Sequence, residues 1–293
     1  MRSDRIMQSR TLSHDYHPRS LDENRYVYAV LSRRSGGVSI GINLNPDKVC
    51  NFDCVYCQVD RRVAGKERRV DLEILEREIK DILMKARSGA LFAQAPFSGV
   101  GKEFQKVTDI AFSGDGEPTT CPQFGEAVEL AIAAKKEVGL SELKLVLITN
   151  ASMFHRARVK RVLLLLDENQ GEIWAKLDAG TEPYYKRVDV TPIPFKRILD
   201  NLLDAARRRP IVIQSLFMRL YGSPPNGGEI EAYSDRLKEI KSNGGMIKLV
   251  QIHTVARAPA QPYVSPLSDK EVDAIAARVG QIPLPVATFY SGR

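Results

Sequence analysis

The sequence predicts an α/β fold in which parallel strands form a partial (β/α)6 TIM-like barrel. Six apolar segments of strand length alternate with amphipathic segments of helix length, and strands separated in this way pair in parallel with right-handed crossovers. Period-two alternation puts polar side chains on one face of the strands, namely Asn43, Ser113, Lys176, Asp178, Gln214, Gln251 and His253. Periodicity alone also fits a doubly wound sheet. The interior of a closed eight-stranded barrel is packed with apolar side chains, so a polar inner face favours a wider, partly open barrel that holds a ligand.

The predicted elements follow one another in a regular order. The strands are residues 38–44, 107–112, 143–149, 172–178, 211–217 and 247–255. The helices are residues 71–87, 122–137, 156–166 and 229–243, together with a helix whose apolar face carries Phe195, Ile198, Leu199, Leu202 and Leu203. Gly244-Gly245 is typical of a helix C-terminus, and Ser268-x-x-Glu271 predicts a capping box that starts a last helix.

Composition sets the outer bounds. The chain has 293 residues, 43% of them hydrophobic, and no apolar run long enough to cross a bilayer, so we expect a globular cytoplasmic protein that does not bind membranes. Residues 1–24 are polar and rich in arginine, which predicts a flexible N-terminal extension, and residues 25–293 form the (β/α)6 domain with its C-terminal helix. The net charge of +7 favours an anionic partner.

Three of the four cysteines lie close together in the segment CNFDCVYC, as Cys50, Cys54 and Cys57. Three thiolates leave tetrahedral zinc one ligand short, whereas an iron–sulfur cube held by three cysteines keeps one iron open for another molecule. A zinc site with a distant fourth ligand is one alternative. A disulfide with one free thiol is another, but the N-terminus lacks the apolar core of a secretory signal.

The CxxxCxxC spacing, with Tyr56 before the last cysteine, resembles the radical S-adenosylmethionine (SAM) superfamily. The resemblance implies a [4Fe–4S] cluster on Cys50, Cys54 and Cys57, with SAM bound to the open iron through its amine and carboxylate. It also implies reductive cleavage of SAM to a 5′-deoxyadenosyl radical, and a partial (β/α)6 barrel. The rival class is a non-enzymatic nucleic-acid or protein-binding module with a structural metal.

A second motif lies where the second predicted strand ends, as Gly114-Asp115-Gly116-Glu117. In radical SAM enzymes a GGE element at this point binds the amino group of SAM, and the motif resembles it with Asp115 between the glycines. An ordinary βα turn is the alternative, because glycine, aspartate and proline are common turn formers.

Later strand ends carry further polar residues. By the same resemblance, Asn150 and Tyr56 are expected at the cofactor, Asp178 at the ribose hydroxyls of SAM, and Lys176 at Asp178, the SAM carboxylate or the substrate. The alternative for each is a hydrogen-bonded polar residue inside the barrel. His253 and Cys121 are expected to be structural, since inward histidines and lone buried cysteines usually are. No catalytic residue is assigned.

Several segments resemble a subgroup of Fe–S oxidoreductases grouped with tRNA wyosine-base synthases: Ser32-Arg33-Arg34, residues 40–44, GEPT, Ile148-Thr149-Asn150 and residues 176–180. By resemblance, wyosine synthases carry a Schiff-base lysine and extra cysteines ahead of the cluster. This chain has no lysine before Lys48 and no cysteine before Cys50, and arginine cannot form the imine because it stays protonated. We therefore predict a different, unknown substrate, with tRNA wyosine formation through Lys48 or Lys176 as the alternative.

A basic run follows the cysteines and consists of Arg61, Arg62, Lys66, Arg68 and Arg69. Most such runs are solvated surface. At this position the run also suits an acidic electron donor, a flavodoxin or ferredoxin, or a phosphate-bearing substrate. Nucleic-acid binding is not favoured, because aromatic residues are not interleaved with the basic ones.

Overall fold

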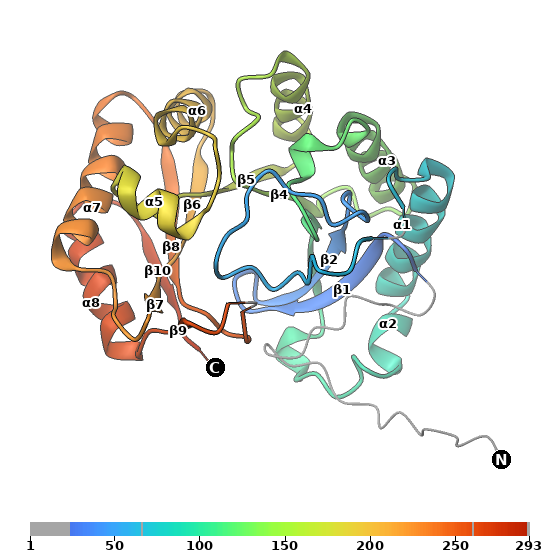
Figure 1. Ribbon diagram of the computed structural model, residues 1–293. Coiled ribbons are helices and arrows are strands. Elements are labelled where there is room, and N and C mark those ends of the chain that lie inside the picture. Colours follow the sequence, from blue (N-terminus) through green and yellow to red (C-terminus); the bar gives the residue numbers. More distant parts are fainter. Residues whose placement is uncertain (1–23, 66, 260, 292–293) are drawn as a thin grey trace.

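A computed structural model of the chain describes residues 24–65, 67–259 and 261–291. Its main sheet has eight strands in the order β1-β2-β3-β4-β5-β6-β8-β10, which is also their order along the chain. The sheet curls into a half-barrel with helices on its outer face, and the loop after β2 arches across the open centre (Figure 1). The predicted α/β partial barrel is thus confirmed. The predicted extension, residues 1–24, lies almost wholly outside the described residues.

The strands of the main sheet are short. They are β1 (Val27–Ser32), β2 (Gly37–Ile42), β3 (Val107–Phe112), β4 (Lys144–Thr149), β5 (Gly171–Lys176), β6 (Ile211–Leu216), β8 (Ile247–His253) and β10 (Val286–Phe289). Strand β1 is antiparallel to β2, and the other neighbours are parallel. Strands β7 (Met218–Leu220) and β9 (Val264–Pro266) form a separate antiparallel pair.

The helices surround the sheet in chain order. They are α1 (Leu72–Arg87), α2 (Ala90–Ala93), α3 (Phe124–Glu137), α4 (Ala157–Asp167), α5 (Glu182–Val188), α6 (Phe195–Arg208), α7 (Gly227–Ser242) and α8 (Asp269–Val279), with short 3-10 helices η1 (Lys102–Phe104) and η2 (Pro118–Thr120). The capping box of Ser268 and Glu271 starts α8 as predicted. Gly244 has φ +83° just beyond α7, which is the left-handed conformation expected after a helix C-terminus.

The six predicted strands correspond to β2, β3, β4, β5, β6 and β8, and the structure adds β1 and β10 at the two edges. Strand β1 is buried at most positions on both faces, so it lacks the alternation that marks a half-buried strand. Strand β10 has four residues, all partly exposed. Helix α5 also went unpredicted, because its seven residues bury only Tyr185 and Val188.

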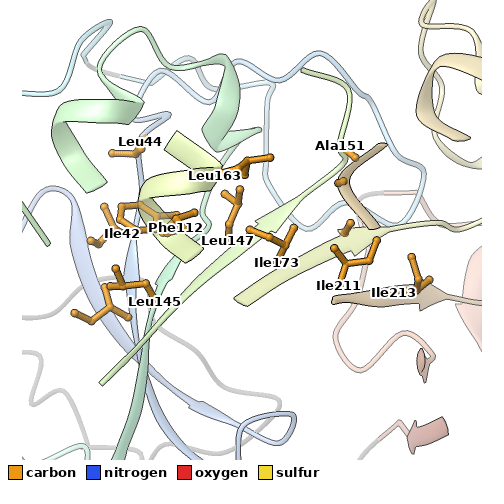
Figure 2. Close-up of a cluster of buried hydrophobic side chains, with 14 of the residues drawn as sticks. Ile42, Leu44, Phe112, Leu145, Leu147, Ala151, Leu163, Ile173, Ile211 and Ile213 are labelled. Carbon is orange, nitrogen blue, oxygen red and sulfur yellow. The ribbon is translucent and has the colours of Figure 1, made fainter. Parts of the chain in front are cut away.

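Apolar side chains pack on both faces of the sheet. The main core lies between the sheet and the helices, where Ile42, Phe112, Leu147, Ile173 and Ile213 meet residues such as Leu163 of α4 (Figure 2). A small cluster of Ala111, Val146, Trp174 and Val212 occupies the opposite, inner face. This second cluster fills part of the barrel interior and leaves the rest of the inner face to polar residues.

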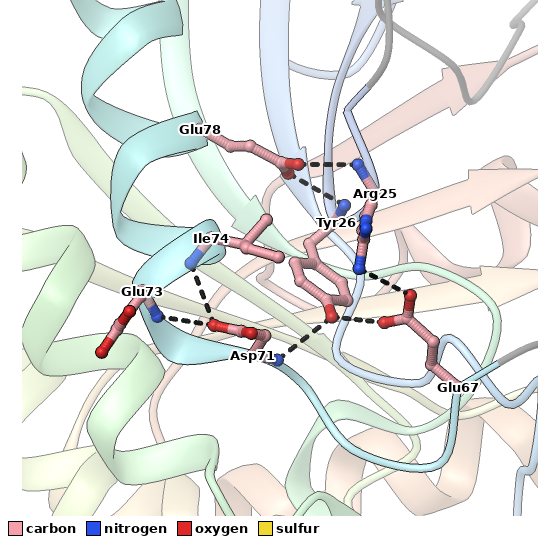
Figure 3. Close-up of polar contacts among 7 residues, drawn as sticks. All are labelled: Arg25, Tyr26, Glu67, Asp71, Glu73, Ile74 and Glu78. Carbon is pink, nitrogen blue, oxygen red and sulfur yellow. Dashed lines mark hydrogen bonds and ion pairs between the residues drawn. The ribbon is translucent and has the colours of Figure 1, made fainter.

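A polar cluster fixes the first strand to the first helix (Figure 3). The carboxylate of Glu78, on α1, accepts hydrogen bonds from the backbone N–H groups of Arg25, Tyr26 and Val27 at 2.8 to 3.0 Å. The Tyr26 hydroxyl donates to Glu67 and accepts from the Asp71 N–H. Because Glu78 is buried, these bonds compensate the loss of water around its charge.

None of the helices in the described part of the chain is both long and apolar enough to span a bilayer.

Candidate active site

A cavity of about 370 Å³ lies inside the half-barrel, within the usual range for small-molecule sites. It brings together Cys50, Cys54 and Cys57 with the other cofactor-binding candidates, which are Tyr56, Gly114, Asp115, Gly116, Glu117, Asn150, Lys176 and Asp178. Most of these residues follow the carboxyl ends of parallel strands, which meet at one edge of the sheet. Ligands of α/β folds bind at that edge.

The cysteine loop is fastened to the end of β4 through Asn51. The Asn51 side chain donates to Ser152 Oγ at 2.7 Å and accepts from Asn150 Nδ2 at 2.9 Å. Its backbone carbonyl accepts from Thr191 Oγ1 at 2.9 Å. Asn150 is thus held against the cysteine loop, and its role toward a cofactor stays a prediction.

The three thiols are free and partly buried. Cys57 Sγ accepts a hydrogen bond from Arg61 Nη1 at 2.9 Å, and Cys54 Sγ donates to Asp189 Oδ1 at 3.5 Å. Burial raises the pKa of Cys50, and burial together with Asp189 and Asp178 raises the pKa of Cys54 well above its ordinary value. Both would have to lose their protons on binding a metal centre.

The donor set fits a [4Fe–4S] cluster. Three free thiols are the protein ligands that an iron–sulfur cube with one open iron requires. All three thiols line the same cavity, next to the loop that carries Gly114 to Glu117.

The two glycines of the second motif allow this loop to pack against the cysteine loop. A Cβ atom at Gly116 would lie 2.3 Å from the Val49 carbonyl oxygen, and one at Gly114 would lie 2.4 Å from Asn43 Oδ1. Asn43 Nδ2 also donates to Asp115 Oδ2 at 2.8 Å. Close contact between the two loops therefore requires glycine at these positions.

Glu117, the last residue of the second motif, is buried. Its Oε1 accepts from the N–H and hydroxyl of Thr119 at 3.1 and 2.5 Å and from Thr149 Oγ1 at 2.7 Å. Its Oε2 accepts from the Asn150 N–H at 2.7 Å. Burial raises the pKa of Glu117, although these donors oppose the shift. The carboxylate therefore links η2 to the end of β4. The predicted contact with the SAM amine would use Oε2, because Oε2 accepts only one of the four hydrogen bonds and Oε1 accepts three.

Tyr56, Lys176 and Asp178 form a second polar group. The Tyr56 hydroxyl donates to Asp178 Oδ2 at 2.5 Å, and Lys176 Nζ lies 3.2 Å from the same oxygen. Lys176 Nζ also lies 4.9 Å from the centre of the Tyr56 ring. Asp178 Oδ1 accepts from the Leu216 N–H at 2.7 Å. The pairing of Lys176 with Asp178 is one of the alternatives that the sequence offered.

Sequence reasoning missed three neighbours of the cysteines: Asn51, Arg61 as a thiol partner, and Asp189. Arg61 donates to the Lys48 and Asp115 carbonyls as well as to Cys57, so it ties the cysteine loop together. Asp189 follows α5, 135 residues beyond Cys54. No local pattern marks it, because the fold alone brings it to the cysteines.

Other candidates lie outside the cavity lining. Cys121 is buried in the apolar core, as expected for a lone cysteine. Lys48 Nζ is exposed and donates to the Asp60 and Val63 carbonyls. Lys66 of the basic run is outside the described residues, and Arg62 pairs with Asp60 on the surface.

The part of the chain that carries the cysteines and the second motif is similar to known proteins. The family model described as "Radical SAM superfamily" matches residues 44–231. A UPF0026 protein of Methanocaldococcus jannaschii is 26% identical over 264 residues, covering 86% of this chain and 70% of that protein. A UPF0026 protein of Synechocystis is 32% identical over 181 residues, covering 60% of this chain and 57% of that protein. A protein of Brachyspira hyodysenteriae named GTPase Obg is 25% identical over 189 residues, covering 64% of this chain and 24% of that protein.

Solved structures share the fold. A radical SAM methyltransferase from Sphaerobacter thermophilus superposes with a TM-score of 0.64 at 13% identity, covering 91% of this chain and 70% of that one. A structure of TYW1 with a lysine-pyruvate adduct bound gives 0.59 at 15% identity, covering 90% of this chain and 85% of that one.

Proposed function

Because the chain belongs to the radical SAM superfamily, whose family model matches residues 44–231, we propose that it holds a [4Fe–4S] cluster on Cys50, Cys54 and Cys57 and cleaves SAM there. The observation that carries the proposal is the meeting of all three free thiols with the Gly114–Glu117 loop in one cavity. The substrate is not established.

When bound, the cluster supplies one electron to the sulfonium of SAM, which yields methionine and a 5′-deoxyadenosyl radical. The residues of this chain bind and orient the reactants around that chemistry. Arg61 donates to Cys57 and Asn51 holds the cysteine loop against β4, so both fix the position of the thiols.

We assign the methionyl end of SAM to the loop of Gly114 to Glu117 and the ribose to Asp178. Asp178 is buried and oriented by the Leu216 N–H and the Tyr56 hydroxyl. A carboxylate already held by donors loses little conformational entropy when it accepts a further hydroxyl. Lys176 lies beside it and faces the remaining cavity, where we place the substrate.

Two residues of the basic run, Arg61 and Arg62, have a role in the proposed function. Arg61 donates to a thiol of the cysteine loop, while its neighbour Arg62 is exposed on the surface. An acidic flavodoxin or ferredoxin is the electron donor we propose, because surface arginines there would steer it toward the cluster.

A second candidate is tRNA wyosine-type base modification. It rests on Lys176, a lysine that lines the cavity and carries the primary amine that an imine with pyruvate requires. Lys48 does not line the cavity. The missing upstream lysine and cysteines keep this candidate second.

Anaerobic reconstitution followed by reduction with SAM tests the leading proposal. We expect about four iron and four sulfide per chain, and slow formation of methionine and 5′-deoxyadenosine without substrate. Colourless protein that binds zinc in place of iron would favour the structural-metal module and overturn the proposal.

Single alanine variants provide the matched controls. Replacing Cys50, Cys54 or Cys57 by alanine should abolish the cluster, whereas Cys121→Ala should retain it, because Cys121 is in the apolar core away from the cavity. Full iron content in any of the first three, or loss of iron in Cys121→Ala, would show that the ligand assignment is wrong.

A further inference from the structure

One group of residues that line the cavity is basic, and we call it the basic wall. Arg33 and Arg34, in the turn between β1 and β2, form it together with Lys176, His253 and Arg257. The pKa of Arg34 is lowered to about 10, first by burial and then by Arg257. Several cations gathered in a partly buried space repel one another, and a bound anion would relieve that repulsion.

Arg34 forms no ion pair among the described residues, although the nearby charge of Asp109 opposes the lowering of its pKa. Its guanidinium carbon lies 5.5 Å from the centre of the Trp174 ring, within cation–π range. Asp109 also lines the cavity, but its two oxygens accept from the hydroxyls of Ser39 and Thr108. A guanidinium held over an indole ring still has N–H groups that can pair with an oxyanion.

His253 supplies a second polar group, whose ring is approached by the Gln251 backbone. Its Nδ1 is buried and makes no hydrogen bond within the described part of the chain. Burial, followed by Lys176, Arg34 and Arg33, lowers the pKa of His253 well below its ordinary value. A buried ring nitrogen left unpaired is costly, so a ligand that pairs with it would stabilise the site.

Arg34 of the basic wall and Trp174 lie next to the assigned SAM site rather than within it. Trp174, Lys176 and Asp178 are alternate residues of β5 and its end, and all three line the cavity. Alternate residues of a strand are roughly 7 Å apart. Trp174, over which the Arg34 guanidinium lies, is therefore two such steps from Asp178, with Lys176 between them.

We propose that Arg34, which lies over the Trp174 ring, and His253 bind an oxyanion of the substrate, a carboxylate or a phosphate. This inference rests on the proposed function, because it places the anchored substrate beside the site of SAM cleavage. Binding the anion there leaves the rest of the molecule to extend past Lys176 toward the cysteines.

The test uses the single tryptophan of the chain, Trp174, as the reporter. Reconstituted protein saturated with S-adenosylhomocysteine is titrated anaerobically with inorganic phosphate and, separately, with acetate, at constant ionic strength. We expect a saturable change in tryptophan fluorescence, with the same affinity by calorimetry. The probe that binds more tightly identifies the oxyanion as phosphate or carboxylate.

Matched variants connect the signal to the site. Arg34→Gln should weaken anion binding about 10- to 100-fold, and Arg34→Lys should weaken it less because the charge remains. Arg62→Gln is the control, because its side chain is 89% exposed and pairs with Asp60 on the surface. It removes one positive charge and should leave the affinity unchanged. Iron content and circular dichroism establish that each variant is folded.

Three results would overturn the inference: no saturable binding of either anion, equal weakening in Arg34→Gln and Arg62→Gln, or competition between the anion and S-adenosylhomocysteine. The last would mean that the basic wall serves the SAM carboxylate. SAM cleavage by the wild-type protein without added anion tests the proposed function separately. Cleavage without anion binding would refute the oxyanion site alone, and anion binding without cleavage would refute the proposed function alone.

Discussion

Replacing Glu117 by glutamine should both destabilise the fold and weaken SAM binding. Three of the four hydrogen bonds to the carboxylate reach Oε1 and one reaches Oε2, from the Asn150 N–H. The amide oxygen of glutamine should take the Oε1 position, which leaves its NH2 group facing the Asn150 N–H. One charged hydrogen bond, worth about 1.5–3 kcal/mol, is lost and a buried donor stays unpaired. Because removing the charge also removes part of its burial cost, we expect a net loss of about 3 kcal/mol.

Urea unfolding of the metal-free protein, followed by the fluorescence of Trp174, measures this effect. With a slope of about 3 kcal/mol per molar urea, the midpoint should fall by about 1 M. If Glu117 also contacts the SAM amine, the dissociation constant of SAM should rise about tenfold or more in the reconstituted variant.

Thr119→Val separates the two roles. It removes one hydroxyl donor to Oε1 and leaves Oε2 unchanged, so it should lower stability by about 1 kcal/mol and preserve SAM affinity. An unchanged urea midpoint in Glu117→Gln would refute the hydrogen-bond reasoning. A loss of SAM affinity that follows stability equally in both variants would refute the amine contact.

Three further predictions concern the loops, acid stability and the second candidate function. Gly116→Ala should lower the iron content on reconstitution, because its Cβ would lie 2.3 Å from the Val49 carbonyl in the cysteine loop. Glu172→Gln should lose less stability than the wild type as the pH falls below 4.5. Burial raises the pKa of Glu172, but the opposing hydrogen bonds from Lys248 and Trp174 leave it below 4.5. A carboxylate with a lowered pKa contributes stability that disappears as the pH falls. Borohydride should trap no pyruvate on Lys176, and N1-methylguanosine-containing tRNA incubated with reductant, SAM and pyruvate should yield no tricyclic base.

Each of these has its own control and contrary result. Gly125→Ala places its Cβ 3.5 Å from Val162, an ordinary contact, and should retain iron; equal iron in both glycine variants would contradict the steric argument. Urea midpoints of Glu172→Gln that run parallel to the wild type from pH 6 to pH 3.5 would contradict the acid prediction. A pyruvate adduct that disappears in Lys176→Arg would favour wyosine-type chemistry.

The central strands and most helices could be predicted because each satisfies a local rule. The boundaries of α1 and α8 follow from the capping residues Asp71 and Ser268, and the inward polar residues follow from the alternation of β5. Strand β1 was not predictable, since its burial on both faces removes the alternation. The predicted parallel strands and their polar inner face were sufficient to favour a half-barrel over a closed barrel.

The site was predictable where neighbouring residues in sequence form it, as in the cysteine motif. It was not predictable where distant residues meet. Asp189 reaches Cys54, and Asn51 reaches Ser152 across 101 residues. Lys135, on α3, is a charged residue of a type usually found on the surface. It is nevertheless buried and donates to the carbonyls of Leu143 and Asn169. Charge patterns in sequence cannot distinguish such a lysine from a solvated one.

The order of the strands has a consequence for how the cavity is assembled. Each strand of the main sheet pairs with the strand that precedes it there, so the sheet can grow from β1 onward as the chain is synthesised. Its two edges are joined where Arg33 donates to the Tyr290 carbonyl across 257 residues, a contact that can form only after nearly the whole chain has been synthesised. Arg33 adjoins Arg34, and Phe289, which precedes Tyr290, lines the cavity. A nascent chain can therefore complete the cysteine loop and its contact with β4 well before this side of the cavity is enclosed.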